Sequence, residues 1–257
     1  MDAWIQNCIM WRDILKAGGD ISFLQEFSVY FYQAFVEADR WKQYLGGMGT
    51  TLYVTALALA LGVCLGIIVA VVRTAHDQQR PGHRNPVLGV VNFVCKIYVT
   101  VIRGTPMMVQ LLIMSAVIFA SSREYTAVGA LTLGINSGAY VSEIIRGGLM
   151  SVDKGQMEAG RSLGLSYVPT MRFVVIPQAV KSILPALGNE FIILLKDTSL
   201  ITTIGGKEML YAARAIATRT FENMFPLVGV ACMYLVLVMI FSWLLGLLER
   251  RLRQSER

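Results

Sequence analysis

Polar side chains recur at helical spacing inside stretches that are otherwise apolar. In the stretch 125–150, spacings of four, three and four positions place one set on a single helical face: Asn136, Tyr140, Glu143 and Gly147. Polar groups in hydrocarbon are costly, so they usually face a bundle interior or a water-filled cavity. This face is therefore a candidate lining for a polar cavity.

A second polar set lies in the stretch 181–200. Asn189 and Glu190 fall near its middle, and Lys196, Asp197, Thr198 and Ser199 cluster at its end. Gln110 is the main polar group of the stretch 106–120. We predict a pathway for a solute that carries both charges, lined by Gln110, Asn136, Tyr140, Asn189, Glu190, Thr198 and Ser199. The alternative is that these groups only bond to one another between helices.

A short polar segment, 151–170, separates two apolar runs. Asp153 followed by Gln156 resembles a capping box, and Gly164 is typical of a helix end. Ser166 and Pro169 suit the start of a second helix. The spacing predicts a helix of about ten residues that presents Glu158 and Arg161 outside the membrane. Such a loop offers a binding surface through which a partner outside the membrane could move the spans.

The motifs of common catalytic sites are missing. The sequence has no GxxxxGK[ST] phosphate loop, no HExxH and no GxSxG. Its four cysteines are scattered without zinc-ligand spacing, and His76 and His83 have no partner pattern. We therefore expect no catalytic residue, no metal site and no cofactor of its own.

The composition is that of a polytopic, all-α membrane protein. Of the 257 residues, 55% are hydrophobic and 16% charged, and the mean hydropathy is +0.56. We predict five spans in a transmembrane domain over 45–248: Leu45–Val72, one crossing within 87–120, Tyr125–Met150, Lys181–Leu200 and Asn223–Leu248. Pro177 and Pro185 should kink the fourth. Paired glycines, Gly62 with Gly66 and Gly134 with Gly138, should let helices approach closely.

The distribution of Lys and Arg sets the expected orientation. The net charge is +6, and Arg73, Arg80 and Arg84 mark a cytoplasmic loop, so the N-terminus should be outside. The basic tail 249–257 should be cytoplasmic, which requires an even number of intervening spans. One crossing within 87–120 satisfies this, and we place its first half along the cytoplasmic face, with the crossing starting near Pro106. The segment 201–222 then lies outside, against the charges of Lys207, Arg214 and Arg219.

Residues 1–44 form a separate segment on the extracellular side. Ile21–Phe35 is aromatic but interrupted by Gln25, Glu26 and Gln33, which predicts an amphipathic helix on the membrane surface. An additional span is the alternative. The first residues lack a basic stretch followed by an apolar core, so a cleaved signal peptide is not expected.

The chain resembles a permease of the ATP-binding-cassette (ABC) importers. That superfamily carries a cytoplasmic EAA motif: Glu-Ala-Ala, three residues, Gly, nine residues, then Ile-x-Leu-Pro. Here Glu158-Ala159-Gly160, Gly164 and Val174-Val175-Ile176-Pro177 match it, with Gly160 for Ala, Val174 for Ile and Ile176 for Leu. The polar amino-acid branch (the histidine, glutamine and cystine type) is similar in further motifs: RGTP at 103–106, NSGAYVSEIIRGG at 136–148, GQMEAGRSLG at 155–164, PQA at 177–179 and KDTSL at 196–200.

The resemblance implies a helical bundle with a cytoplasmic coupling helix, working with partners in the cell membrane. Two permease chains, identical or related, would form the pore, two ATPase subunits would bind ATP, and an extracytoplasmic binding protein would deliver an amino acid. No nucleic-acid partner is expected. The residues implied in ATPase coupling are Gln156, Glu158, Ala159, Gly160, Arg161, Gly164 and Leu165. Those given structural roles are Arg103, Pro106, Glu143, Arg146, Pro177 and Pro185.

For the substrate we predict a polar or charged L-amino acid. Glu190 and Asp197, with Arg103 and Lys196 nearby, offer both charges to a zwitterion. Cystine, glutamine and the basic amino acids remain open. An ion-coupled secondary transporter is the alternative function, although no internal repeat is visible. A membrane scaffold would leave the polar residues unexplained.

Overall fold

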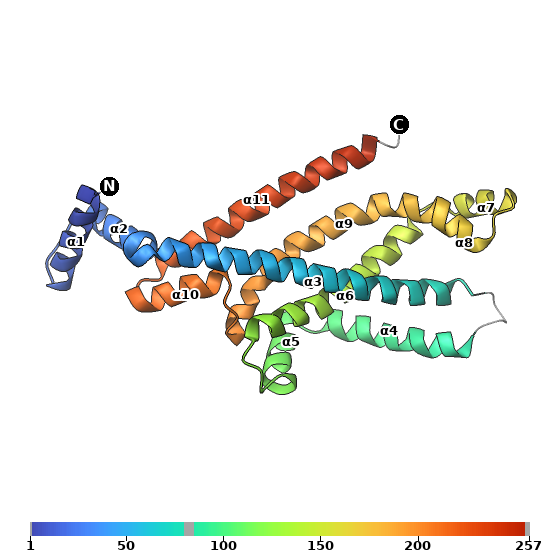
Figure 1. Ribbon diagram of the computed structural model, residues 1–257, viewed down its shortest axis with the longest axis horizontal. Helices are drawn as coiled ribbons and strands as arrows, with labels where there is room; N and C mark the ends of the chain where they lie inside the picture. The colour runs from blue at the N-terminus through green and yellow to red at the C-terminus, as the bar shows by residue number, and fades with distance from the viewer. Residues whose placement is uncertain (1, 80–84, 255–257) are drawn as a thin grey trace.

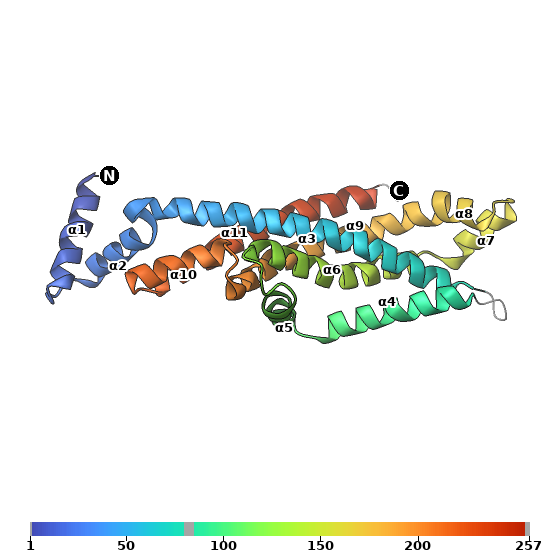
Figure 2. The ribbon, with the colours of Figure 1, turned by 60° about the horizontal axis from the view of Figure 1, so that its bottom comes forward.

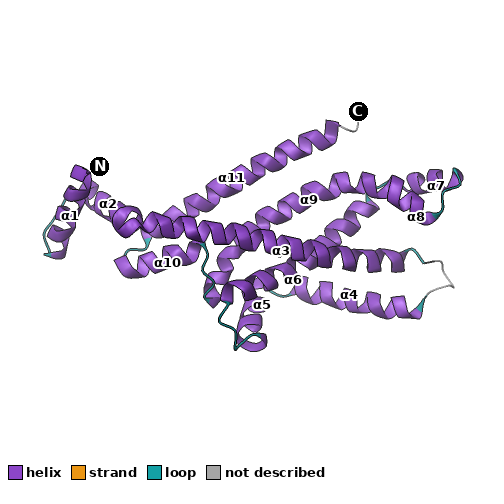
Figure 3. Cartoon of the chain, in the orientation of Figure 1, coloured by secondary structure: helices purple, strands orange, loops and turns teal. Residues whose placement is uncertain are grey.

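The computed structural model describes residues 2–79 and 85–254, and all regular structure in these ranges is helical (Figure 3). The N-terminal segment contains α1 (Asp2–Lys16) and α2 (Phe23–Phe31), followed by a π turn (Tyr32–Val36) and a 3-10 turn (Glu37–Asp39). The long helix α3 (Arg40–Asp77) runs along much of the molecule, and α4 (Pro86–Gly104) returns beside it (Figure 1). Residues 80–84 of the predicted basic loop and 255–257 of the tail lie outside the described ranges.

The second half of the chain adds four longer helices and a short hairpin. After α5 (Met107–Ile113) and a π turn (Met114–Ile118) comes α6 (Tyr125–Met150), which occupies the range expected from the sequence. The helices α7 (Lys154–Ser162) and α8 (Tyr167–Thr170) form the hairpin. A π turn (Met171–Val175), α9 (Ile176–Asp197), a 3-10 turn (Thr198–Ile204), α10 (Met209–Thr220) and α11 (Met224–Gln254) complete the chain.

The molecule is elongated, and its two ends differ (Figures 1 and 2). The hairpin end carries α7 and α8 beside the ends of α3, α6 and α9. The N-terminal end carries α1, α2 and α10. The segment 201–222 therefore lies at the end opposite the hairpin, as expected despite its basic residues.

Close packing of α3 on α6 forms the centre of the bundle. A Cβ added at Gly62 would lie 2.8 Å from Ser137 Oγ, and one added at Gly66 would lie 2.5 Å from Val141 Cγ1. Only glycine permits this approach of the two backbones, which confirms the close packing expected of this pair. A core cluster beside this contact contains Val54, Ala58, Leu111, Ala130, Leu133, Leu194 and Ile201.

Four helical stretches among the described residues are long and apolar enough to cross a membrane: Phe23–Asp77, Pro86–Gly104, Tyr167–Ile204 and Met224–Leu252. Helix α6 is not among them because it carries polar and small residues, many of them buried inside the protein. With 26 residues, α6 is nevertheless long enough to cross a membrane. The total of five crossings stays a prediction.

The expected course of residues 87–105 is wrong. The sequence places this stretch flat along the cytoplasmic face. Instead, α4 packs lengthwise against α3 and α6, with Val99 beside Val69 and Ala139. Lys96, a charged residue in the middle of α4, does not interrupt the helix, because its side chain is exposed and its stem can lie along apolar surface. Pro106 ends the helix at RGTP, and the stretch Met107–Ile118 that follows is short.

The N-terminal segment does not add a separate span. Helix α2 has nine residues, about 14 Å, and left-handed backbone at Ala38 and Asp39 (φ 54° and 56°) separates it from α3. Phe27 and Tyr30 contact Phe225 of α11, so α2 is held at the N-terminal end. Its contact with a membrane surface stays a prediction.

Candidate functional site

The hairpin forms where the sequence predicts a short polar helix. Asp153 caps α7 by accepting a hydrogen bond from the Gly155 amide at 2.6 Å. Gly164 ends the helix with a φ of +85°, a left-handed conformation that glycine adopts without strain. Ser166 then precedes α8. The local signals for start, stop and restart are therefore confirmed.

The residues implied in ATPase coupling divide into an exposed set and a buried one. Gln156, Glu158, Ala159, Arg161, Gly164 and Leu165 are exposed, whereas Gly160 is buried. A Cβ at Gly160 would lie 2.5 Å from Thr170 Cγ2, so this position brings α7 against α8. The replacement of the motif's Ala by Gly therefore has a local packing reason.

Gln156 does not complete a capping box. Its Oε1 accepts a hydrogen bond from Gln178 Nε2 at 3.1 Å, which ties α7 to α9. Tyr167, at the start of α8, donates to Gln78 Oε1 at the end of α3. The hairpin is thus bonded to two helices, and its outward face remains exposed.

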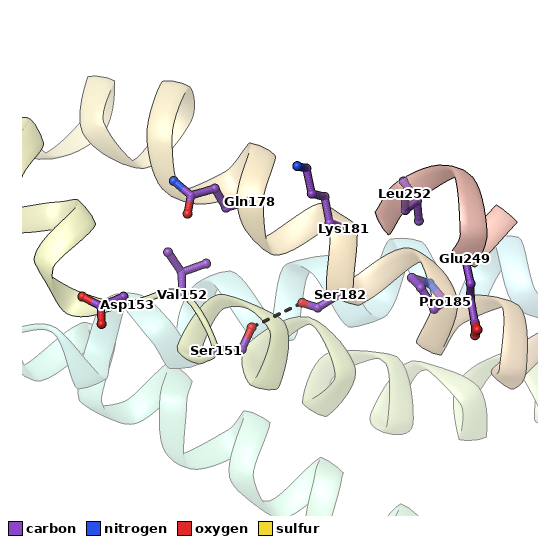
Figure 4. A pocket seen from close by; sticks show the side chains of 9 residues that line it. All are labelled: Ser151, Val152, Asp153, Gln178, Lys181, Ser182, Pro185, Glu249 and Leu252. Carbon is purple, nitrogen blue, oxygen red and sulfur yellow. Dashed lines mark hydrogen bonds between the residues drawn. The ribbon is translucent and has the colours of Figure 1, made fainter. Parts of the chain in front are cut away.

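An open pocket of about 710 Å³ lies beside the hairpin (Figure 4). Most of its lining is polar, and Ser151 and Ser182 are bonded across it at 3.3 Å. It is lined by Ser151, Val152, Asp153, Gln178, Lys181, Ser182, Pro185, Glu249 and Leu252. It contains none of the residues predicted for the solute pathway.

Two of the predicted pathway residues bond to each other. Gln110 Nε2 donates to the carbonyl of Ile102 at 2.8 Å and to both oxygens of Thr105. Its Oε1 accepts from Asn136 Nδ2 at 3.0 Å. Gln110 thus links the ends of the break between α4 and α5 to α6. This contact is what the interhelical alternative predicts for the pair.

The remaining pathway residues face different surroundings. Glu190 is buried and accepts a hydrogen bond from Ser137 Oγ at 2.7 Å, whereas the adjacent Asn189 is exposed. Tyr140 is exposed, with the Arg103 guanidinium 5.1 Å from its ring centroid. Thr198 and Ser199 each donate to a carbonyl of the preceding turn, those of Leu195 and Lys196. A single chain does not gather these groups around one cavity among the described residues.

An ion-pair cluster joins α3 to α6 toward the hairpin end. Glu143 accepts from Arg73 and, at 2.8 Å, from Arg146 Nη2. Arg73 enters the sequence interpretation only as an orientation signal. Its pairing with Glu143 requires the parallel packing of α3 on α6, which no local motif reveals.

Two of the three prolines predicted to be structural lie at helix starts, and the third lies within a helix. Pro106 caps α5, and Pro177 lies in the first turn of α9, where a missing amide is tolerated. Pro185 lies inside α9. The π turn Met171–Val175 directly precedes the Pro177 turn and joins the hairpin to α9.

A buried carboxylate at the N-terminal end has no counterpart in the sequence interpretation. Glu208 is 1% exposed and caps α10, accepting from the Tyr211 amide at 2.8 Å. Hydroxyls of Thr51, Thr202 and Tyr234 also donate to it, the last at 2.5 Å. The isolated glutamate before α10 is a local signal, but two of its donors, Thr51 of α3 and Tyr234 of α11, come from distant segments.

No group of three His, Cys, Asp or Glu side chains in the described ranges could hold a metal ion. The functional features of the fold are therefore an exposed hairpin and polar side chains bonded between helices. Both suit movement of helices better than bond-making chemistry.

Comparison with known proteins places these features in a family. Residues 87–254 match the model of the binding-protein-dependent transport system inner membrane component. The chain is 35% identical over 212 residues to the glutamine transport system permease protein GlnP of Escherichia coli K12, covering 80% of this chain and 91% of the relative. It is 33% identical over 208 residues to a putative GlnP of Rickettsia bellii, covering 79% and 89%.

Solved structures of ABC transporters also match this chain. An amino acid ABC transporter crystallised with histidines matches with a TM-score of 0.74 at 36% identity, covering 90% of this chain and 99% of that one. The MetNI methionine ABC transporter matches with a TM-score of 0.68 at 19% identity, covering 85% and 99%, and at that identity it supports the fold alone.

Proposed function

The chain belongs to the inner membrane component family of binding-protein-dependent transport systems, and we propose that it carries a polar or charged L-amino acid into the cell. It is a permease subunit and not an enzyme. The names of the similar proteins support an amino-acid substrate. Glutamine is the first candidate, and cystine, histidine and the basic amino acids belong in the same test.

The exposed hairpin is the observation that carries this proposal. It is covalently joined to α6 and α9, is bonded to α3 and α9, and leaves Glu158 and Arg161 exposed. A partner that gripped this surface would move several spans together. We propose that two ATPase subunits dock there, one on each of two permease chains, and that they bind the ATP.

The proposed orientation places the hairpin end in the cytoplasm and the N-terminal end outside. The basic residues flanking the apolar runs support this arrangement. An extracytoplasmic binding protein would then deliver the amino acid at the end that carries α1, α2 and α10. Tyr140 and Asn189, which are exposed in the single chain, are the pathway residues best placed to face a second permease chain.

Uptake by reconstituted transporter tests this function. Proteoliposomes should contain the permease with the ATPase and binding protein encoded beside its gene. We expect labelled L-glutamine to accumulate only with internal ATP, and a panel of unlabelled amino acids should compete in order of preference. Uptake that persists without the ATPase and collapses with an ion gradient would instead establish ion-coupled transport.

A further inference from the structure

The hairpin is connected to a third helix that the chain path does not predict. Its backbone leads only to α6 and α9, yet Tyr167 donates a hydrogen bond to Gln78, 89 positions away. Gln78 caps the end of α3, and its own amide bonds back to Thr74 and His76 carbonyls. The acceptor is therefore fixed to the last turn of a long helix.

This bond crosses a poorly filled region. A cavity of about 400 Å³ has Tyr167 and Gln78 in its lining, together with Thr74, Leu149 and Met171. A neighbouring cavity of about 420 Å³ lies under α7 and also reaches Thr74 and Gln78. Within residues 2–79 and 85–254, the Tyr167–Gln78 bond is the one side-chain hydrogen bond between the hairpin and α3. Packing across these cavities is thin, so this bond is the main link across them.

Helix α3 is suited to carry a displacement over a long distance. Its 38 residues span about 57 Å, and its glycines pack it directly on α6. Near its other end, Thr51 Oγ1 donates to the buried Glu208 at 3.5 Å. A rigid shift of α3 imposed at Gln78 would therefore reach the contacts of α3 with α10 at the N-terminal end.

We propose that Tyr167 and Gln78 are positioning residues through which the hairpin drives α3 as well as α9. This proposal rests on the proposed function, because it assigns a route by which the conformational change of the ATPase reaches the spans. The backbone moves α6 and α9, and the hydrogen bond adds α3. Coupling between distant sites needs such a physical link to an element that both sites bias.

Replacing Tyr167 by Phe in the complete transporter tests this route. The change removes one hydroxyl and keeps the ring, so the hairpin should still fold and bind the ATPase. We expect the amount of amino acid imported per ATP hydrolysed to fall about fivefold, which is the scale of one hydrogen bond. ATP hydrolysis itself should stay within twofold of the parent. Tyr53→Phe is the matched control, because Tyr53 is an exposed tyrosine on α3 and should leave the ratio unchanged.

A second pair of variants separates the contact from a general loss of structure. Gln78→Met should reproduce the loss, and combining it with Tyr167→Phe should add nothing, because one bond is removed in each case. Gln78→Glu retains an acceptor and should restore most of the ratio. Additive losses, or an unchanged ratio in Tyr167→Phe, would overturn the route through α3. If the parent transporter shows no ATP-dependent uptake, the proposed function is refuted, and the route through α3 is refuted with it.

Discussion

At the N-terminal end of the molecule the carboxylate of Glu208 is buried, whereas at the hairpin end that of Glu158 is exposed. Glu208 receives hydrogen bonds from three helical segments and from its own α10. Glu158 has no hydrogen bond or ion pair among the described residues. The first end buries its carboxylate within the chain, and the second leaves an exposed carboxylate available to another molecule.

This difference separates stability from function along one chain. Buried hydrogen-bonded groups hold helices in place, and removing one partner leaves the others without compensation. Exposed charged groups contribute little to stability, so their value lies in what they bind. The two ends should therefore respond in opposite ways to the loss of a glutamate.

Glu208→Ala should have the largest effect on stability. It leaves the buried hydroxyls of Thr202 and Tyr234 without their acceptor, and we expect a loss of about 3–5 kcal/mol. The measurement is the midpoint of thermal unfolding of the detergent-purified permease. Glu208→Gln keeps one acceptor oxygen and should cost clearly less. A Glu208→Ala protein as stable as the parent would show that this network does not hold the N-terminal end together.

Gly160→Val should have an intermediate effect on stability, because Gly160 is a buried residue within the otherwise exposed hairpin. Its Cβ would approach Thr170 Cγ2 at 2.5 Å, which forces α7 away from α8. Overpacking of this kind costs about 1–3 kcal/mol. The same unfolding assay applies, with Ala159→Val as a matched change on the exposed side of α7. Equal midpoints for the two variants would mean that the hairpin adjusts freely.

Glu158→Ala should have the smallest effect on stability and a large one on transport. An exposed substitution changes the unfolding free energy by less than about 0.5 kcal/mol. If the hairpin binds the ATPase, uptake in proteoliposomes should nevertheless fall about tenfold, a loss of about 1.4 kcal/mol of coupling. Normal uptake would show that Glu158 is not part of the proposed coupling surface, and the exposed glutamate would then have no demonstrated role in transport.

Local patterns in the sequence predict the hairpin well. The capping Asp153, the terminating Gly164 and the restart at Ser166 act over a few residues, so the sequence contains all the information needed. The helix Tyr125–Met150 is equally predictable from local sequence, because its polar residues are too widely spaced to interrupt a helix. The five-span helical bundle follows from such stretches together with the resemblance.

Contacts between distant segments were the part that the sequence could not supply. The donors to Glu208 and the pairing of Arg73 with Glu143 depend on how helices pack, not on neighbouring residues. The course of α4 is predicted wrongly because the count of crossings requires one crossing within 87–120 but does not say which half of that stretch makes it. The pathway residues were grouped by polarity, and the structure distributes them over the helices α5, α6 and α9 and the turn that follows.

The length of α3 has a consequence for the surrounding lipid. At about 57 Å it is nearly twice the thickness of a typical hydrocarbon core, about 30 Å. A helix with that much surplus can meet a thicker bilayer by tilting less and a thinner one by tilting more. Transport should therefore vary little when the acyl chains are lengthened or shortened by a few carbons.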